Sequence, residues 1–266
     1  MLNGFWQAEL CVPAEDRGFL LGDGLFETLL AVDGSPRWWQ AHWERLKRSA
    51  AALGFVLPRS EAETLADVHL ALEANDLTRG LAAVRLTVTR GRGSRGYWSE
   101  DIHSPLLLVT AARYHRRSTP LRAITVAEFP RNERSPLCHH KTTSALELVL
   151  AQRTAHQRGA DVALLVNTRG EWVEASYANL FLVIDGELLT PPLESGVLPG
   201  IARAFLQQKL PVREAPIAAE MWAQAQAAFL TNSLMGARSL GWVDGYEMDI
   251  TNPLVQEAAE ILDSIV

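Results

Sequence analysis

The sequence predicts an α+β protein of two domains. Stretches with strand periodicity and stretches with helix periodicity are mixed without strict alternation, which favours α+β over a doubly wound parallel sheet. A polar stretch that ends in proline, residues 113–120, separates two such mixed regions. The length of 266 residues accommodates two domains. We therefore expect an N-terminal domain over residues 1–112, a linker over 113–120 and a C-terminal domain over 121–266.

The first half contains strand and turn signals. Residues 19–32, FLLGDGLFETLLAV, are apolar enough for one strand, but the triplet Gly22-Asp23-Gly24 interrupts it. Asp33-Gly34 predicts a hairpin turn. Two further strands are predicted, one from the alternation of Val84, Leu86 and Val88 with polar residues and one over 106–112.

Two helices are predicted between these strands. The first ends at Gly54, and its apolar positions recur at intervals of four and three residues: Trp39, Trp43, Leu46, Ala50 and Leu53. Ser60 and Glu63 form a capping box that opens the second helix, which we expect to continue to about Leu77.

The second half restarts with a strand near residues 124–129. Ser144 and Glu147 suggest a capping box, so we expect a helix just past Lys141. DVALLVN and LFLVI are typical of buried strands on either side of a turn at 168–170. Gly200 precedes a helix over residues 201–208, AAFLTNS ends a strand, and Asn252-Pro253 opens a C-terminal helix.

Composition excludes several classes of protein. With a net charge of -6 and no basic run longer than residues 115–117, the chain is not expected to bind nucleic acid. No apolar run has the length of a membrane span, and residues 1–10 lack the pattern of a secretory signal. Cys11 and Cys138 form no motif and the histidines show no ligand spacing, so we expect free thiols, a cytoplasmic location and no metal.

Lys141 lies in the stretch HHKTTSALELVL, at the start of the predicted helix. Most lysines are solvated and do no chemistry, and that is one interpretation here. The other is a reactive amine, because the positive end of a helix lowers the proton affinity of a nearby amine, and a neutral amine can form a Schiff base.

Three further stretches suggest a cofactor. Glu174 leads into a buried strand, where a carboxylate needs a partner, either a protonated ring nitrogen or an arginine. The stretch GVLPGIAR places a glycine before a helix, whose bare N–H groups suit a phosphate. Thr231-Asn232-Ser233 could bind phosphate oxygens or close a turn. Arg45, by itself, is typical of a solvated helix arginine.

Together these stretches resemble the fold-type IV pyridoxal phosphate enzymes, which include branched-chain and D-amino acid aminotransferases and aminodeoxychorismate lyase. The similar segments are RGFLLGDGLFETL, HWERLKRSA, EASYANLF and GVLPGIAR, together with the position of Lys141. The resemblance implies a smaller N-terminal α/β domain, a larger C-terminal domain, and a homodimer that binds pyridoxal 5'-phosphate.

The resemblance also implies roles for single residues. Lys141 would be the catalytic Schiff-base lysine, and Glu174 would hold the pyridine nitrogen. The phosphate would be bound by Arg45, by the N–H groups of Ile201 and Ala202, and by Asn232.

Within the family the chain most resembles aminodeoxychorismate lyase, which would release 4-aminobenzoate and pyruvate for folate biosynthesis. RGRGSRGY, residues 90–97, is similar to a lyase loop, and Leu146 stands where the aminotransferases commonly place a tyrosine. The loop arginines Arg92 and Arg95 are candidates for binding the substrate carboxylates, or are simply solvated. An aminotransferase is the alternative; a protein without turnover would be expected to lack Lys141 or Glu174.

Overall fold

The computed structural model describes residues 1–5 and 11–264, so part of the stretch considered as a secretory signal lies outside the described residues. The chain forms two compact units. The first runs to His115 and also includes Lys141–Ala145, and the second contains the remainder. The break after His115 falls within residues 113–120, whereas no sequence pattern had assigned Lys141–Ala145 to the first unit.

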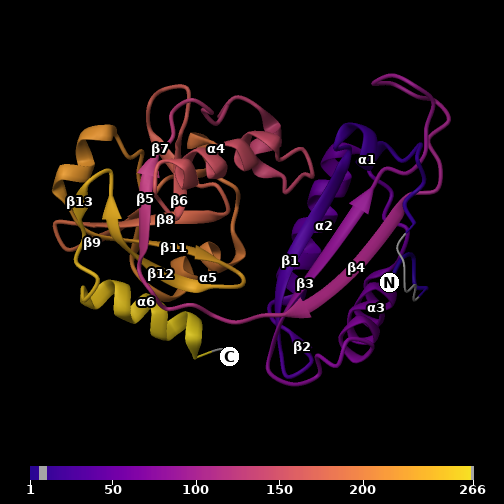
Figure 1. Ribbon diagram of the computed structural model, residues 1–266, viewed down its shortest axis with the longest axis horizontal. Helices are drawn as coiled ribbons and strands as arrows, with labels where there is room; N and C mark the ends of the chain where they lie inside the picture. Colours follow the sequence, from indigo (N-terminus) through magenta and orange to yellow (C-terminus); the bar gives the residue numbers. More distant parts are fainter. Residues whose placement is uncertain (6–10, 265–266) are drawn as a thin grey trace. The chain divides into compact units, whose positions relative to one another are not determined.

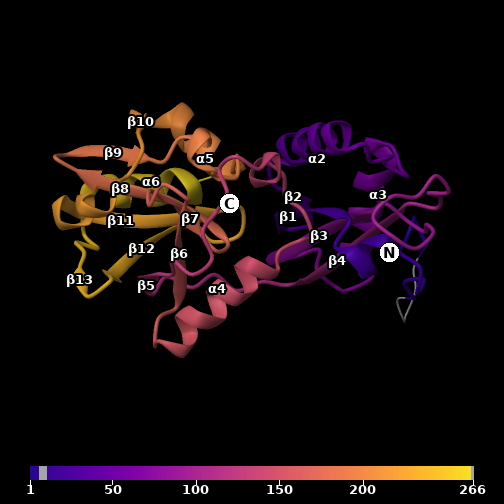
Figure 2. The same cartoon turned by 90° about the horizontal axis from the view of Figure 1, so that it is seen from above.

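The first unit is an antiparallel sheet covered on one face by two helices (Figures 1 and 2). Its strands have the order β2-β1-β3-β4, and α2 and α3 supply the covering side chains. Val84, Leu86 and Val88 are buried and alternate with more exposed residues, as predicted. The bounds are β1 Gly24–Val32, β2 Ser35–Pro36, α2 Trp39–Leu53, α3 Glu61–Glu73, β3 Leu81–Thr89 and β4 Leu106–Arg113.

Local signals located one turn, the end of α2 and the start of α3 correctly. Asp33 and Gly34, with φ of 46° and 80°, form the turn between β1 and β2. Helix α2 ends at Gly54 in the left-handed conformation, and Ser60 opens α3 with both hydrogen bonds of a capping box. Helix α3 stops at Glu73, short of the predicted end at Leu77, and the chain continues as a turn.

The prediction of an interrupted strand over residues 19–32 was wrong in its first part. Residues Arg17–Leu21 form a short helix, α1, and only β1 is a strand. The Asp16 side chain accepts a hydrogen bond from the N–H of Phe19, and Gly22 ends the helix with φ of 67°. Phe19 and Leu20 are exposed as a result, so this apolar run does not contribute to the core.

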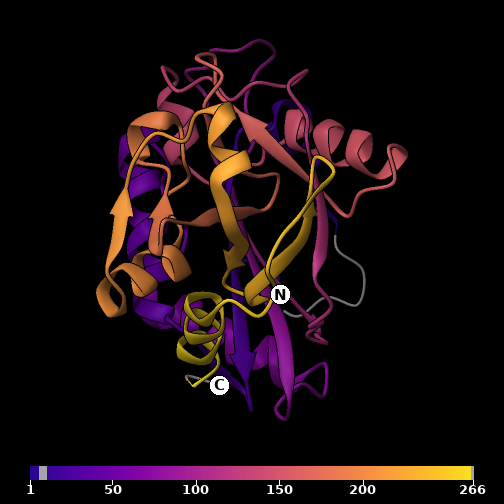
Figure 3. The same cartoon turned by 90° about the vertical axis from the view of Figure 1, so that its left-hand side faces the viewer.

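The second unit is built on a sheet that closes on itself (Figures 1 and 3). The strand order is β10-β9-β8-β11-β12-β5-β6-β7, with β13 on β12, and β7 also pairs with β8. The strands β8, β11, β12, β5, β6 and β7 therefore form a ring around a core of aliphatic side chains that includes Leu164, Leu180 and Leu230. The bounds are β5 Leu121–Thr125, β6 Val162–Val166, β7 Trp172–Ala175, β8 Ala178–Ile184, β9 Glu187–Thr190, β10 Val212–Glu214, β11 Ala225–Asn232, β12 Gly236–Val243 and β13 Tyr246–Glu247.

Three α-helices pack on this sheet. Helix α4 lies on β5 and β6, while α5 and α6 lie against β11. Helices α5 and α6 begin as predicted, after Gly200 and with Asn252 capping the N–H of Leu254 at 3.1 Å. The bounds are α4 Leu146–Gln157, α5 Ile201–Lys209 and α6 Pro253–Asp263, with 3-10 turns η1 Pro136–His139, η2 Leu193–Ser195 and η3 Ala219–Gln224. No helix within the described residues is long and apolar enough to cross a membrane.

Two strand predictions in this unit need correction. Strand β5 covers residues 121–125 rather than 124–129, because the residues from Leu121 onward pair in parallel with β12. Strand β7 was not predicted, since four residues are too few to show alternation. Glu174 consequently lies within β7 instead of leading into the next strand.

Candidate active site

Lys141 is held against β1 by its own backbone. Its carbonyl accepts a hydrogen bond from the N–H of Phe26 at 2.9 Å, and the N–H of Thr143 donates to the carbonyl of Gly24 at 2.9 Å. These bonds flank an antiparallel bridge between Leu25 and Thr142. The segment therefore sits as a strand-like addition to the first sheet.

The side chain of Lys141 is half-buried, and its Nζ lies 4.5 Å from the centroid of the Phe26 ring. A cation over an aromatic face is stabilised by the quadrupole of the ring. Lys141 is therefore neither fully solvated nor fully buried. A partly desolvated amine held by its backbone is suited to nucleophilic chemistry.

The two hydroxyl residues after Lys141 bind the glycine turn before β1. Thr143 Oγ1 and Ser144 Oγ donate to the carbonyl of Gly22 at 2.8 and 3.0 Å. The predicted capping box at Ser144 is therefore wrong, and α4 begins later, at Leu146. A Cβ at Gly22 would lie 2.8 Å from Ser144 Oγ, and one at Gly24 would lie 2.8 Å from Thr143 Oγ1. This close approach explains why both turn residues are glycines.

Arg45 is part of a buried cluster with Glu27 and His42. Arg45 donates from Nε to Glu27 Oε1 at 2.7 Å and from Nη2 to Oε2 at 2.6 Å. His42 Nδ1 lies 2.7 Å from the same Oε2. All three side chains are almost fully buried, so the interpretation of Arg45 as a solvated helix arginine is wrong.

The residues of this cluster shift one another's pKa. Burial alone would raise the pKa of Glu27, but the ion pair with Arg45 and the hydrogen bond from His42 lower it to about 2. Burial lowers the pKa of His42, and the positive charges of Arg45 and Lys141 lower it further, while Glu27 opposes them. Arg45 and Lys141, both predicted site residues, thus act electrostatically on the same histidine.

Sequence reasoning missed Glu27 and His42. A signal was present for each, because Glu27 occupies an inward position of β1 between Leu25 and Leu29, and His42 precedes Arg45 by nearly one helical turn. A charged residue among inward-facing leucines requires a buried counter-charge.

In the second unit, Glu174 is held by groups of two kinds. Its Oε2 accepts hydrogen bonds from Asn179 Nδ2 at 3.2 Å and from the N–H of Leu198 at 3.1 Å. Its Oε1 lies 3.4 Å from Arg131 Nη2. The arginine partner that the sequence left as an alternative is therefore present, and the carboxylate is both oriented and charge-compensated.

Three polar side chains form a row across neighbouring strands. Thr231 of β11 is paired with Asn179 of β8, which is paired with Glu174 of β7. Directly paired residues point to the same face of a sheet. The hydroxyl of Thr231 is buried, and among the described residues it has no hydrogen-bond partner. An unsatisfied buried hydroxyl in this row suits an additional polar group such as a phosphate.

Helix α5 begins beside this row. Gly200 provides no side-chain cap, and the first N–H groups of a helix, here those of Ile201 and Ala202, have no carbonyl partner within it. A Cβ at Gly200 would lie only 1.8 Å from Asn179 Oδ1, so the amide of Asn179 requires glycine there. Bare amides and an orphan hydroxyl suit the phosphate of pyridoxal phosphate, and a carboxylate beside an arginine suits its ring nitrogen.

Asn232 has mainly local contacts. Its Oδ1 accepts hydrogen bonds from the N–H groups of Leu234 and Met235 at 2.9 Å each, and its Nδ2 donates to the carbonyl of Tyr177 at 3.2 Å. The turn-closing interpretation of this stretch is thus realised. A phosphate would rely on the second hydrogen of Nδ2.

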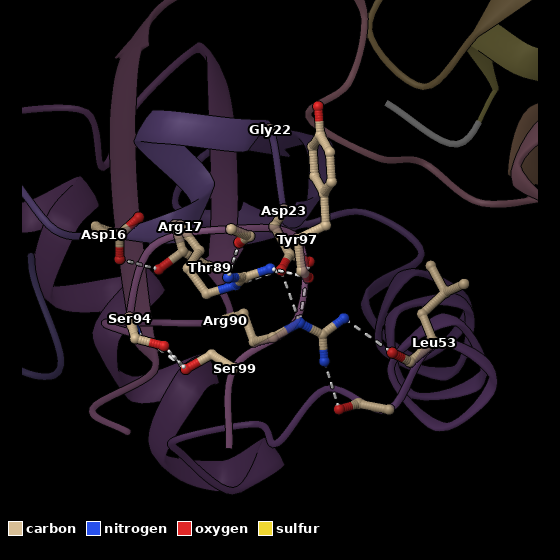
Figure 4. A network of polar contacts seen from close by, with 12 residues as sticks. Asp16, Arg17, Gly22, Asp23, Leu53, Thr89, Arg90, Ser94, Tyr97 and Ser99 are labelled. Atoms are coloured by element: carbon tan, nitrogen blue, oxygen red, sulfur yellow. Dashed lines mark hydrogen bonds and ion pairs between the residues drawn. The ribbon is translucent and has the colours of Figure 1, made fainter. Parts of the chain in front are cut away.

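The loop over residues 90–97 is held in place by arginines other than the predicted Arg92 and Arg95 (Figure 4). Arg17 donates to the carbonyls of Gly96 and Tyr97 at 3.0 and 2.9 Å, and Arg90 pairs with Asp23 at 2.9 Å. Arg92 and Arg95 are exposed to solvent in the first unit.

Arg85 is a cation that sequence reasoning missed. Its guanidinium lies 3.8 Å from the centroid of the Phe26 ring, the same ring that Lys141 contacts. Arg85 occupies an outward position of β3, where the alternation of the strand places its side chain away from the helices. A cation beside the reactive amine is suited to an anionic substrate.

Residues 24–240 match the family model described as amino-transferase class IV. The chain belongs to the class IV aminotransferases. It is 27% identical to an aminodeoxychorismate lyase of Vibrio harveyi over 262 residues, which covers 95% of this chain and 94% of the relative. It is 31% identical to a Methanocaldococcus jannaschii protein provisionally described as a branched-chain-amino-acid aminotransferase, over 92% of this chain and 87% of the relative.

A solved structure from Legionella pneumophila, provisionally described as a 4-amino-4-deoxychorismate lyase, has a TM-score of 0.90 and 31% identity, and covers 98% of this chain and 97% of its own. These likenesses confirm the α+β, two-domain fold of type IV. Class IV aminotransferases depend on pyridoxal 5'-phosphate, and the protein is a pyridoxal phosphate enzyme.

Proposed function

We propose that this class IV aminotransferase family member is a 4-amino-4-deoxychorismate lyase, which releases 4-aminobenzoate and pyruvate. The observation that carries the proposal is Leu146, the first residue of α4 and largely exposed, where the aminotransferases commonly place a tyrosine. Unlike the hydroxyl of a tyrosine, the side chain of Leu146 cannot donate or accept a proton during the reaction. The similarity of residues 90–97 to the lyase loop and the two lyase relatives support the same function.

Lys141 carries the central chemistry in this proposal. When bound, pyridoxal phosphate supplies an electron-accepting ring next to the substrate amine. Lys141 Nζ would hold the cofactor through its aldehyde carbon, and once the substrate amine has taken that place the free amine would remove the proton at C4 of the substrate ring. It returns a proton to the enolpyruvyl group as the ring C–O bond breaks, so that pyruvate leaves and the ring becomes aromatic.

The remaining assigned residues bind and orient. Glu174, ionised and fixed by Asn179, holds the ring nitrogen protonated. Arg45 and the N–H groups of Ile201 and Ala202 bind the phosphate, with Asn232 and the hydroxyl of Thr231 as further donors. Since Arg45 already uses two N–H groups on Glu27, it would contact the phosphate from a fixed orientation.

The two carboxylates of the substrate need cations. Arg92 and Arg95 remain candidates on the basis of the loop resemblance, and Arg85 is added because it shares the Phe26 ring with Lys141. A homodimer and a cytoplasmic location, in keeping with the free thiols of Cys11 and Cys138, belong to the same proposal.

The alternative function is an aminotransferase of the branched-chain or D-amino acid type. It is favoured by the 31% identity to the archaeal relative and by further D-alanine aminotransferase relatives. Lys141 and Glu174 would serve both reactions. The test is an assay of the purified protein with aminodeoxychorismate, set beside a panel of amino donors and keto acids.

A further inference from the structure

Arg131 is fixed beside Glu174 by the backbone. Its N–H donates to the carbonyl of Val166 at 2.8 Å, and it forms a parallel bridge with Asn167 just past the end of β6. Glu174, on the neighbouring strand β7, is paired with Leu165 of β6. Both residues are therefore anchored to the same end of one strand, and their approach does not depend on a flexible loop.

The two oxygens of Glu174 have different surroundings. Oε2 receives hydrogen bonds from the neutral donors Asn179 and Leu198, whereas Oε1 faces the guanidinium of Arg131 at 3.4 Å. The Glu174 side chain is 8% exposed and that of Arg131 is 18% exposed. Where water is scarce, each charge depends on the other. The neutral donors fix the direction of the carboxylate, and the arginine compensates its charge.

We propose that Arg131 is a positioning residue that keeps the proton of the cofactor's ring nitrogen on nitrogen by holding Glu174 ionised. The inference rests on the proposed role of Glu174. A proton shared between a carboxylate and a pyridine nitrogen can reside on either atom. A cation 3.4 Å from the carboxylate oxygen opposes a proton on that oxygen, because the protonated carboxyl group has no negative charge to pair with it. Arg131 thereby favours the carboxylate and pyridinium form, the form that accepts electrons.

A purely structural role for Arg131 would act through a different contact. Its Nη2 also donates to the carbonyl of Cys138 at 3.3 Å, and Cys138 precedes Lys141 by three residues in the chain. Loss of that bond alone would disturb the approach to Lys141 without changing where the ring proton resides. A measurement of the ring nitrogen itself separates the two roles.

The test loads the full chain with pyridoxal phosphate labelled with ¹⁵N in the ring and records the ¹⁵N chemical shift together with turnover. In Arg131→Met we expect the shift to move toward that of an unprotonated pyridine and kcat to fall about 10-fold, the effect of one pKa unit, with KM nearly unchanged. Arg131→Lys keeps the charge and should restore both readouts. Arg134→Met removes an exposed arginine three residues away and should resemble the wild type.

A wild-type shift and turnover in Arg131→Met would overturn the inference. If that variant does not fold, Arg131→Gln replaces it, because glutamine is neutral yet can still donate to the Cys138 carbonyl, and the same displacement is expected. Glu174→Gln identifies where a failure lies. If the cofactor's ring nitrogen stays protonated in Glu174→Gln, the role proposed for Glu174 is wrong. If the nitrogen loses its proton in Glu174→Gln but keeps it in Arg131→Met, only the inference about Arg131 fails.

Discussion

Glu27 binds Arg45 through both of its carboxylate oxygens, at 2.7 and 2.6 Å, inside the first unit. A bidentate pair of this kind fixes the plane of the guanidinium as well as its position. It also complicates any test of Arg45, since removing the arginine leaves a buried carboxylate unpaired, which typically costs about 3–5 kcal/mol of stability. Loss of cofactor affinity in an Arg45 variant must therefore be corrected for loss of folding.

The Glu27 cluster predicts a dependence of stability on pH. The pKa of Glu27 in the folded protein is lowered from 4.5 to about 2, so its contribution is present above the unfolded value and lost as pH falls toward 2. The shift corresponds to about 3 kcal/mol. Urea unfolding at a series of pH values should show a steeper loss between pH 5 and 2 in the wild type than in Glu27→Gln. Glu73→Gln, an exposed control, should follow the wild type; equal slopes in all three would refute the assignment.

Substitution of Thr231 tests the phosphate site, because it should have opposite effects on the stability of the protein and on its affinity for the cofactor. Thr231→Val removes a buried hydroxyl that has no partner among the described residues, so the protein without cofactor should be as stable as the wild type or slightly more stable. Cofactor affinity should fall by one hydrogen bond, about 0.5–1.5 kcal/mol. Thr190→Val, whose hydroxyl donates to the Leu180 carbonyl at 2.8 Å, should lower stability but not affinity. Unchanged affinity in Thr231→Val would remove Thr231 from the site.

Lys141 should be the residue that carries the cofactor. The purified protein should be yellow, and borohydride reduction should attach the cofactor to the peptide that contains Lys141. Lys47, which is exposed and paired with Glu44, serves as an internal control in the same peptide map. Label on a peptide other than that of Lys141 would contradict the assignment.

The three candidate arginines should affect substrate rather than cofactor. Arg85→Met removes the cation that shares the Phe26 ring with Lys141, and loss of one charge-assisted contact of about 1.5–3 kcal/mol should raise KM by roughly 10-fold or more. The double variant at Arg92 and Arg95 tests the loop in the same way. Cofactor absorbance should be unchanged in both variants. An unaltered KM in either one would remove the corresponding arginines from substrate binding.

Sequence patterns located the elements whose signals are local. The capping box at Ser60, the glycine after α2 and the Asn252-Pro253 helix start depend on neighbouring residues alone, and all three are confirmed. Helix α1 and strand β7 were missed because five and four residues carry too little periodicity to be distinguished.

The contacts of the candidate site were harder to predict, because they join residues that are distant in the sequence. The backbone of Lys141 pairs with that of Phe26, far away in the chain. The Ser144 hydroxyl donates to the carbonyl of Gly22 instead of opening the capping box that Ser144 and Glu147 had suggested. Arg45 was mistaken for a solvated residue because its burial depends on Glu27, a partner on another element. Charged residues on helix flanks can be assigned only when the counter-charge is known.

The proposed reaction is an elimination, and the stoichiometry of products from aminodeoxychorismate alone is its sharpest test. A lyase needs no keto acid, because Lys141 displaces the product and restores the starting enzyme. We predict that pyruvate and 4-aminobenzoate appear in equal amounts over many turnovers, with no keto acid added. If no pyruvate is released, and the protein instead interconverts amino acids and keto acids, the lyase proposal is contradicted and the aminotransferase function stands.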